Sequence, residues 1–238
     1  MIADVHTHVG VDMNGPFQHQ TMAELKRKML RYGIDKSVVF PFSEPNLVES
    51  SLKLARHRSE SIIPFLRFDP NKMQSMKLRQ LLKGNAFSGV KLHTRAQVFD
   101  PLNKKFIPLY REIADSGKPL IIHTRLEKNP NSDPERVMLL GDLVPGMTLI
   151  LAHFAGISIK AFDYAKAHKN VYIETSALST DYLIKMIVER IGADKLIFGS
   201  DSPLSDQEIE IMKISKAKIS SAQRERIFHR NLAKIIDL

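Results

Sequence analysis

Short apolar runs alternate along the chain with longer segments in which apolar residues recur every three or four positions. The short runs favour buried strands, and the longer period favours amphipathic helices. Successive strands are separated by 21 residues (His153 to Glu174) to 32 residues (His8 to Phe40), which leaves room for a helix in each interval. The predicted strands end near His8, Phe40, Phe68, His93, His123, His153, Glu174 and Ser200. This alternation predicts repeated βα units around a parallel sheet.

Eight such units in 238 residues predict a single small (β/α)8 TIM barrel that occupies residues 1–238 as one domain. The competing arrangement is an open, doubly wound sheet with a glycine-rich phosphate-binding turn after its first strand. Residues 9–16 contain neither a G-x-G-x-x-G pattern nor a P-loop lysine. The pattern therefore favours the closed barrel.

Helix boundaries are marked by capping patterns. Thr21 and Glu24 form a capping-box pattern at the start of one predicted helix, and Ser132 and Glu135 repeat it at the start of another. The final helix is expected from about residue 222 to residue 236. Each boundary falls between two predicted strands or after the last one.

The chain contains no cysteine. Disulfides, thiolate zinc sites and a cysteine nucleophile are thereby excluded together. Any transition metal must be held by imidazole and carboxylate groups.

The net charge of +9 raises the question of a nucleic-acid partner. Lysine and arginine are spread over nearly all predicted helices, and no aromatic residues interleave with them as a base-stacking surface requires. A solvated outer face is therefore favoured, and nucleic acid is not expected as a partner. Attraction of small anionic substrates is a further consequence of the charge.

No run of 18 apolar residues occurs, and the N-terminus lacks the pattern of a charged leader followed by an apolar stretch. We therefore expect a cytoplasmic protein that does not interact with membranes. Association into a homo-oligomer is left open.

The first strand carries the densest candidate chemistry, in Asp4-Val5-His6-Thr7-His8. Extended backbone sends alternate side chains to one face, so Asp4, His6 and His8 are expected to point to the same side. Two imidazoles then converge on one point. The pair alone is weak support, because a strand with two structurally partnered histidines would look the same.

Three metal-capable side chains strengthen the hypothesis because each follows a short apolar run: His123, His153 and Asp201. Parallel barrels keep their chemistry at this end of their strands. The proposed metal ligands are His6, His8, His123 and Asp201.

Zinc suits this ligand set, and manganese, iron and cobalt are also compatible with it. A coordination position is left open for water, and zinc lowers the pKa of bound water to about 7. Asp201 is then placed to accept the water proton, and His153 to polarise a carbonyl or shuttle a proton. Asp4 is expected to hold the strand or a ligand imidazole.

Together these residues, with Gly89-Val90-Lys91-Leu92-His93 and Gly199-Ser200-Asp201-Ser202-Pro203, resemble the amidohydrolase superfamily and most closely its amidohydrolase-2 branch of metal-dependent TIM-barrel hydrolases. The resemblance runs from residue 2 to the final helix. It implies that His6, His8, His123 and Asp201 bind metal. His153 is a ligand or a catalytic group, depending on the branch. The short chain leaves little room for the lid of some members.

Lys91 bears on the number of metal ions. The resemblance allows a carboxylated Lys91 that bridges two cations, in which case His153 becomes a ligand of the second site. An unmodified Lys91 would instead contact a carboxylate or bind an anionic substrate, and one ion is favoured over two. His93 is either a structural histidine of the barrel or a substrate contact.

Two arginines, Arg95 and Arg125, follow the strand-end histidines by two residues and are expected at the mouth of the barrel. Guanidinium groups match carboxylates and phosphates, so an anionic small-molecule substrate is predicted, with plain solvent exposure as the alternative. Glu174 and Ser176 share a face at the end of the seventh strand. They either line the pocket or support the ligands from behind.

These features favour a hydrolase that uses metal-activated water on an amide, lactone or ester bond of a small anionic substrate. The alternative is a lyase of the same branch, a decarboxylase or hydratase acting on an unsaturated or aromatic carboxylic acid. A third interpretation, a nucleic-acid-binding module with a degenerate site, predicts salt-dependent binding to duplex DNA.

Overall fold

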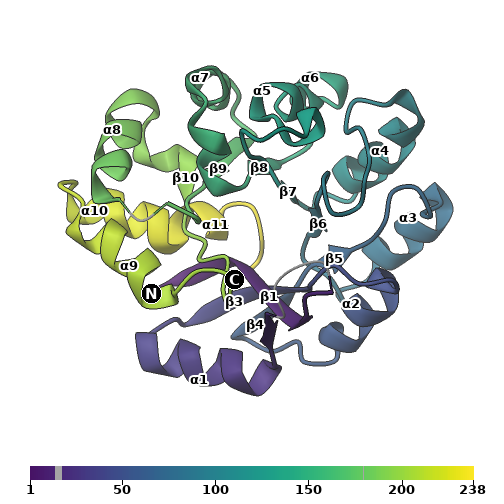
Figure 1. Ribbon diagram of the computed structural model, residues 1–238, viewed down its shortest axis with the longest axis horizontal. Coiled ribbons are helices and arrows are strands. Elements are labelled where there is room, and N and C mark those ends of the chain that lie inside the picture. The colour runs from purple at the N-terminus through teal and green to yellow at the C-terminus, as the bar shows by residue number, and fades with distance from the viewer. Residues whose placement is uncertain (14–17, 179) are drawn as a thin grey trace.

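The computed structural model describes residues 1–13, 18–178 and 180–238. Its parallel strands follow one another around a central axis (Figure 1). They are β1 (Ala3–Val11), β3 (Lys36–Pro41), β4 (Ile62–Pro64), β5 (Leu66–Arg67), β6 (Val90–Leu92), β7 (Leu120–Ile122), β8 (Leu149–Leu151), β9 (Val171–Glu174) and β10 (Leu196–Ile197). Residues 14–16 of the first loop, for which no phosphate-binding turn is expected, lie outside the described part of the chain.

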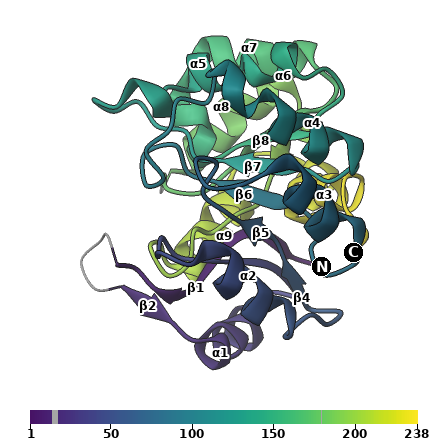
Figure 2. The same cartoon turned by 90° about the vertical axis from the view of Figure 1, so that its right-hand side faces the viewer.

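Helices surround the strands on the outside (Figure 1). The α-helices are α1 (Met22–Tyr32), α2 (Leu47–Ala55), α3 (Ser75–Lys83), α4 (Ile107–Asp115), α5 (Pro134–Val137), α6 (Leu140–Leu143), α7 (Ile159–Ala167), α8 (Asp181–Ile191), α9 (Gln207–Lys216), α10 (Ser221–Glu225) and α11 (Asn231–Ala233). Short turns of other pitch are η1 (Lys104–Phe106), η2 (Pro130–Ser132), η3 (His153–Ile157), η4 (Ala193–Lys195) and η5 (Arg226–Arg230). Strand β2 (His19–Gln20) pairs antiparallel with the end of β1, and this hairpin projects to one side of the barrel (Figure 2). No helix of the described residues is long and apolar enough to cross a bilayer.

One junction of the sheet lies between β4 and β5, which are separated only by Phe65. The Phe65 N–H donates to the Val39 carbonyl at 2.9 Å, and the next N–H, of Leu66, donates to the Gly89 carbonyl at 2.9 Å. One continuous strand therefore joins β3 on one side to β6 on the other. Gly89 is needed here, because a Cβ atom at this position would overlap the Phe65 ring.

The other junction joins β1 to the segment after β10. The Val5 N–H donates to the Phe198 carbonyl at 3.0 Å, and the Asp201 N–H donates to the His6 carbonyl at 2.8 Å. The sheet thus returns to its first strand, and the predicted (β/α)8 barrel is confirmed.

A bulge in β1 changes which side chains enter the barrel. Asp4 pairs with Ser37 and Thr7 pairs with Val39, so three steps along β1 match two steps along β3. One extra residue is therefore accommodated, and a bulge re-aims the side chains beside it. Val5 packs in the apolar cluster inside the barrel. The next side chain, His6, also points inside, because the centre of its ring lies 5.3 Å from the centre of the Phe40 ring in the same cluster.

The prediction that Asp4, His6 and His8 share one face of the strand is wrong for this reason. Strict alternation holds only where the pairing register is unbroken. The extra residue leaves Asp4 on the outer face and turns both histidines inward. The Asp4 carboxylate meets Gln207 at the start of α9, outside the barrel.

The helix boundaries follow the predicted caps in part. Thr21 and Glu24 form the expected capping box at α1. Helix α5 instead begins after Asp133, whose carboxylate accepts the Glu135 N–H at 2.8 Å, so the prediction of Ser132 as its cap is wrong. Ser132 is buried at the end of η2, and its hydroxyl bonds to Thr94. The final helix is interrupted by the wider turn η5 and ends with α11.

Candidate active site

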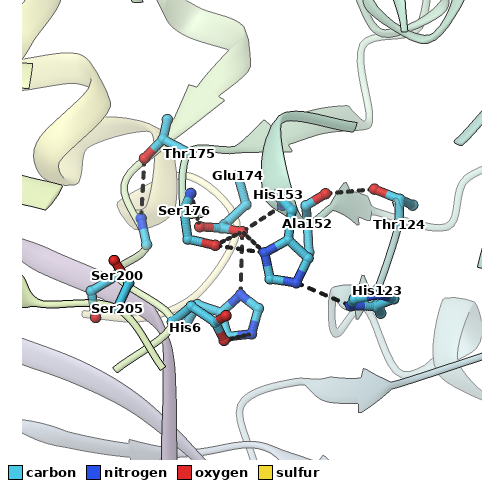
Figure 3. A network of polar contacts seen from close by, with 12 residues as sticks. His6, His123, Thr124, Ala152, His153, Glu174, Thr175, Ser176, Ser200 and Ser205 are labelled. Atoms are coloured by element: carbon cyan, nitrogen blue, oxygen red, sulfur yellow. Dashed lines mark hydrogen bonds and ion pairs between the residues drawn. The ribbon is translucent and has the colours of Figure 1, made fainter. Parts of the chain in front are cut away.

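Four histidines, two carboxylates and a lysine meet inside the barrel at the carboxyl end of its strands. Figure 3 shows the part of this group around Glu174, which lies between the imidazoles of His6 and His153. The seven side chains come from six different strands or the segments directly after them: His6, His8, Lys91, His123, His153, Glu174 and Asp201. All seven residues are buried.

Asp201 lies against both histidines of β1. Its Oδ1 is 3.1 Å from the Nε2 atom of His6 and 3.1 Å from that of His8. Lys91 Nζ also lies 3.1 Å from His6 Nε2. The Asp201 side chain is 11% exposed, so this carboxylate keeps contact with solvent.

Glu174 lies on the opposite side of the His6 ring and is completely buried. Its Oε2 is 3.2 Å from His6 Nδ1 and accepts the Ser176 hydroxyl and the His153 N–H, each at 2.9 Å. Its Oε1 accepts the Ser176 N–H at 2.5 Å. This carboxylate is therefore satisfied entirely by the protein.

His153 and His123 form the other edge of the group. His153 Nδ1 is 2.8 Å from the Ser176 hydroxyl, and its Nε2 is 3.0 Å from His123 Nδ1. His93 stacks on the His123 ring at a centroid distance of 3.8 Å. His93 thus forms part of the wall of the site.

The backbone turns into the left-handed region directly after β8. The φ angles are 58° at His153, 52° at Phe154 and 46° at Ala155. Each non-glycine residue in this region costs roughly 1–2 kcal/mol, and such strain gathers at functional sites. The turn aims the His153 N–H at Glu174, which offsets part of this cost.

The group satisfies the chemical requirements of a cation site. Ligand atoms of His6, His153 and Asp201 all lie within 4.8 Å of one another. Zinc binds nitrogen and oxygen at about 2.0–2.2 Å, so its ligands lie up to about 4 Å apart. Two buried ring nitrogens, His8 Nδ1 and His123 Nε2, have no hydrogen-bond partner among the described residues. The residues present therefore fit a divalent metal.

Of the four ligands predicted from the sequence, His6 and His8 touch Asp201 directly. His123 joins the group through His153. The sequence placed His153 in a catalytic role or a second site, whereas the structure puts its ring within metal-ligand range of His6 and Asp201.

The imidazoles are held neutral, which is the form that binds metals. Burial, and then the Lys91 charge, lowers the pKa of His6 well below its usual value. Burial, followed by Arg67, does the same to the pKa of His8. Burial lowers the pKa of His153 to about 3, although the charge of Asp201 acts in the opposite direction.

Lys91 lies on β6 with its ammonium 5.2 Å from the centre of the Phe40 ring. Burial lowers the pKa of Lys91 to about 7, against the favourable charge of Asp201. No carboxylate of the described residues forms an ion pair with it. Lys91 is therefore a buried basic group for which the described residues supply no carboxylate partner.

Arg67, which the sequence analysis missed, is a second buried cation and is 1% exposed. It extends from β5, where its Nη1 donates to the Pro41 carbonyl at 2.9 Å and its Nη2 to the Ser43 hydroxyl at 2.6 Å. Its Nε has no partner among the described residues, and burial lowers its pKa to about 10. The signal was an arginine inside the apolar run Pro64–Phe68 at a strand end.

The two arginines predicted at the mouth lie on the surface. Arg95 is 53% exposed and pairs with Glu127 at 3.0 Å, and Arg125 is also exposed. Arg67 is instead the arginine whose charge acts on His6, His8 and Lys91.

Asp4 acts behind the histidine strand. Its carboxylate accepts the His6 N–H at 3.0 Å, the Ser200 N–H at 2.9 Å and a Gln207 amide N–H at 3.1 Å. Burial raises the pKa of Asp4 to about 6. Asp4 therefore ties β1 to the segment after β10 and to α9, and it bonds to the backbone of His6.

Comparison with known proteins gives one family match, to a model described as amidohydrolase that covers residues 3–238. No curated protein matches the chain.

Solved structures with the same fold cover nearly the whole chain. A 5-carboxyvanillate decarboxylase from Sphingomonas paucimobilis is 14% identical, with 100% of both chains covered and a TM-score of 0.76. A dihydroxybenzoic acid decarboxylase from Polaromonas sp. JS666, with bound manganese, is 15% identical over 99% of this chain and 97% of its own, with a TM-score of 0.75. A putative 2-pyrone-4,6-dicarboxylic acid hydrolase from Pseudomonas putida is 14% identical over 98% and 96% of the two chains, also with a TM-score of 0.75.

Proposed function

The chain belongs to the amidohydrolase-2 family, and on that premise we propose that it is a metal-dependent lyase that removes carbon dioxide from a small aromatic or unsaturated carboxylic acid. The observation that carries the proposal is that a His and Asp cluster suited to a cation lies together with two buried basic side chains, Lys91 and Arg67, that form no ion pair within the described part of the chain. Two of the three relatives described above are decarboxylases. The sequence analysis placed this activity second, after hydrolysis.

We propose His6, His8, His123 and Asp201 as the metal-binding residues, with His153 beside them. Zinc and manganese both suit imidazole and carboxylate ligands, and the Polaromonas relative holds manganese. When bound, the ion would act as a Lewis acid on a substrate oxygen. One ion with an unmodified Lys91 accounts for the cluster, because Lys91 already contacts His6 Nε2 through its amine.

Lys91 and Arg67 would neutralise the substrate carboxylate. Burial of an unpaired charge is costly, and an anion from the substrate offsets that cost. The acids in the names of the three relatives all carry at least one carboxyl group. An anionic substrate therefore suits both the chain and its relatives.

Decarboxylation breaks the bond from the substrate carbon to its carboxyl group. The electron pair stays on that carbon, which then takes up a proton. Asp201 is placed to hold and deliver the proton, because it lies at the cluster and its side chain still reaches solvent. The buried Glu174 cannot exchange protons with solvent in this way.

Hydrolysis of a lactone or other ester is the second candidate, and the Pseudomonas putida relative favours it. In that reaction a water oxygen bonds to the carbonyl carbon, the ester C–O bond breaks, and Asp201 takes the water proton. The same residues serve both reactions. The fate of the substrate carbon therefore separates the two candidates.

The test uses zinc-loaded and manganese-loaded protein in water labelled with oxygen-18. The substrates are 2,6-dihydroxybenzoate, 5-carboxyvanillate and 2-pyrone-4,6-dicarboxylate. We expect release of carbon dioxide from one of the first two acids and no labelled oxygen in the remaining product. Activity should disappear with a chelator and return with the metal. Labelled oxygen in an opened lactone, without carbon dioxide, would replace the lyase with the hydrolase.

A further inference from the structure

We propose that Glu174 and Ser176 are positioning residues that fix the tautomers of His6 and His153, so that both rings keep an unprotonated Nε2 atom. The inference deepens the proposed function, since it assumes that this cluster binds the metal. It concerns the protein before any metal is bound.

The His6 tautomer follows from the chemistry of Glu174. A buried carboxylate only accepts hydrogen bonds, so the His6 Nδ1 that lies 3.2 Å from Glu174 Oε2 must carry the proton. A neutral imidazole has one N–H, which leaves His6 Nε2 with a lone pair. That lone pair lies 3.1 Å from the Asp201 carboxylate oxygen, which has lone pairs of its own. Only a cation between the two atoms, or the Lys91 ammonium beside them, relieves this repulsion.

Ser176 fixes the tautomer of His153 through its hydroxyl group. Its hydroxyl proton is committed to Glu174 Oε2 at 2.9 Å, so the Ser176 oxygen can only accept from His153 Nδ1 at 2.8 Å. The His153 proton is therefore on Nδ1, and its Nε2 carries a lone pair. Glu174 thus fixes the tautomer of His6 directly and that of His153 through the Ser176 hydroxyl.

The orientation of the Glu174 carboxylate is fixed by its surroundings. Backbone N–H groups of His153 and Ser176 hold one oxygen each. Gly199, in the segment after β10, leaves space for it, because a Cβ atom there would overlap the Glu174 carboxylate. These fixed donors and this clearance hold Glu174 in one orientation.

The two rings set by Glu174 belong to His6 and His153, which together with Asp201 form the cluster whose ligand atoms lie within 4.8 Å of one another. The contacts that fix the protons and the distances among the ligand atoms are separate observations. Both lead to the same pair of imidazole rings. A purely structural role for Glu174 would not require this coincidence.

The test compares Glu174→Gln, Ser176→Ala and a matched control, Thr175→Val, in nitrogen-15-labelled, zinc-free protein. Thr175 lies between the two positioning residues in the sequence, and its hydroxyl oxygen accepts the Gly199 N–H at 3.4 Å. Histidine tautomers are assigned from ring nitrogen shifts by NMR, and zinc affinity is measured by competition with a chelator.

We expect Nδ1–H tautomers at His6 and His153 in the unaltered protein. S176A should change the tautomer of His153 alone, whereas E174Q should change both. Supporting partners of metal ligands contribute about 10–100-fold in affinity, so zinc binding should weaken at least tenfold in E174Q and less in S176A. T175V should keep both tautomers and the zinc affinity.

An Nε2–H tautomer at His6 or His153 in the unaltered protein would overturn the inference, whatever reaction the protein catalyses. Equal tautomer changes in T175V would also overturn it, since a general loosening would then explain them. If E174Q does not fold, the selective change at His153 in S176A decides the question. Correct tautomers in a protein that binds no zinc would instead contradict the proposed function alone.

Discussion

The two carboxylates of the site have opposite surroundings. On the Glu174 side, both oxygens are met by donors from the protein, and the side chain is completely buried. On the Asp201 side, one oxygen faces two ring nitrogens, and the side chain is still 11% exposed. Both Glu174 oxygens therefore have their hydrogen-bond donors as soon as the protein folds. On the Asp201 side no directly bonded cation pairs with the carboxylate among the described residues, and this difference indicates where a ligand belongs.

The contrast extends to the residues behind each carboxylate. Hydrogen-bond donors with fixed directions, two of them backbone N–H groups, surround Glu174. Buried cations with few partners, Lys91 and Arg67, act on the Asp201 side. An unsatisfied buried polar group costs about 1–3 kcal/mol, so the protein concentrates this cost on the side that would bind substrate.

Asp201→Asn should give the largest effect. The amide removes the negative charge from the incomplete side and cannot accept or release the proton, so we expect kcat/KM to fall about a thousandfold, equivalent to about 4 kcal/mol. Bound metal, measured by elemental analysis, should fall as well. The matched control is Asp206→Asn, an exposed capping residue of α9. Activity within tenfold of the unaltered enzyme would contradict the assigned role.

Acidification of the metal-free protein should give the next largest effect. Burial lowers the pKa of five imidazoles: His6, His8, His93, His123 and His153. The unfolded chain therefore binds protons below about pH 6.5 that the folded chain does not bind, and stability falls as the pH falls. At pH 5.5 each such imidazole costs up to about 1.4 kcal/mol.

Two buried carboxyl groups act in the opposite direction. Burial raises the pKa of Asp4 to about 6 and that of Glu210 to about 7, so the folded chain protonates these groups first and gains stability on acidification. Five imidazoles outweigh two carboxyls, and we expect a net loss of several kcal/mol between pH 7.5 and 5.5. Urea unfolding at the two pH values measures it. Equal free energies of unfolding would show that the imidazoles are not held neutral.

Substitution of the arginines should give the smallest effects on activity, with a larger effect at Arg67 than at Arg95. Arg67→Met removes a buried cation from the Asp201 side, and we expect KM for the carboxylate substrate to rise about tenfold. Arg95→Met removes an exposed charge that already pairs with Glu127, and its effect should stay within threefold. A larger effect from Arg95 would restore the prediction that the surface arginines bind the substrate. Circular dichroism of both variants checks their fold.

The fold could be predicted because each strand and its end are marked by a local sequence pattern. Apolar runs and their spacing gave eight strands, and a metal-capable residue after a run marks the carboxyl end of its strand. His6, His8 and Asp201 could therefore be assigned to one place although they are far apart in sequence. That inference needed only the order of elements and the direction of the strands.

Other features depend on pairing or on proton direction, which no local pattern records. The bulge in β1 arises from register with β3, so alternation alone misplaced Asp4. The role of Glu174 depends on the commitment of the Ser176 hydroxyl. The cap of α5 moved to Asp133 because η2 already uses Ser132. Each of these details required the neighbouring chain.

The bulge also makes β1 sensitive to insertions and deletions. Removing Val5 would restore simple alternation with both histidines still inside and Asp4 still outside, but it would take an apolar side chain out of the barrel interior. A single codon thus separates a barrel interior that contains the Val5 side chain from one that lacks it. Transplanting the histidine pair to another barrel requires only the alternation of residues 6–8, whereas the apolar packing of Val5 also requires the extra residue.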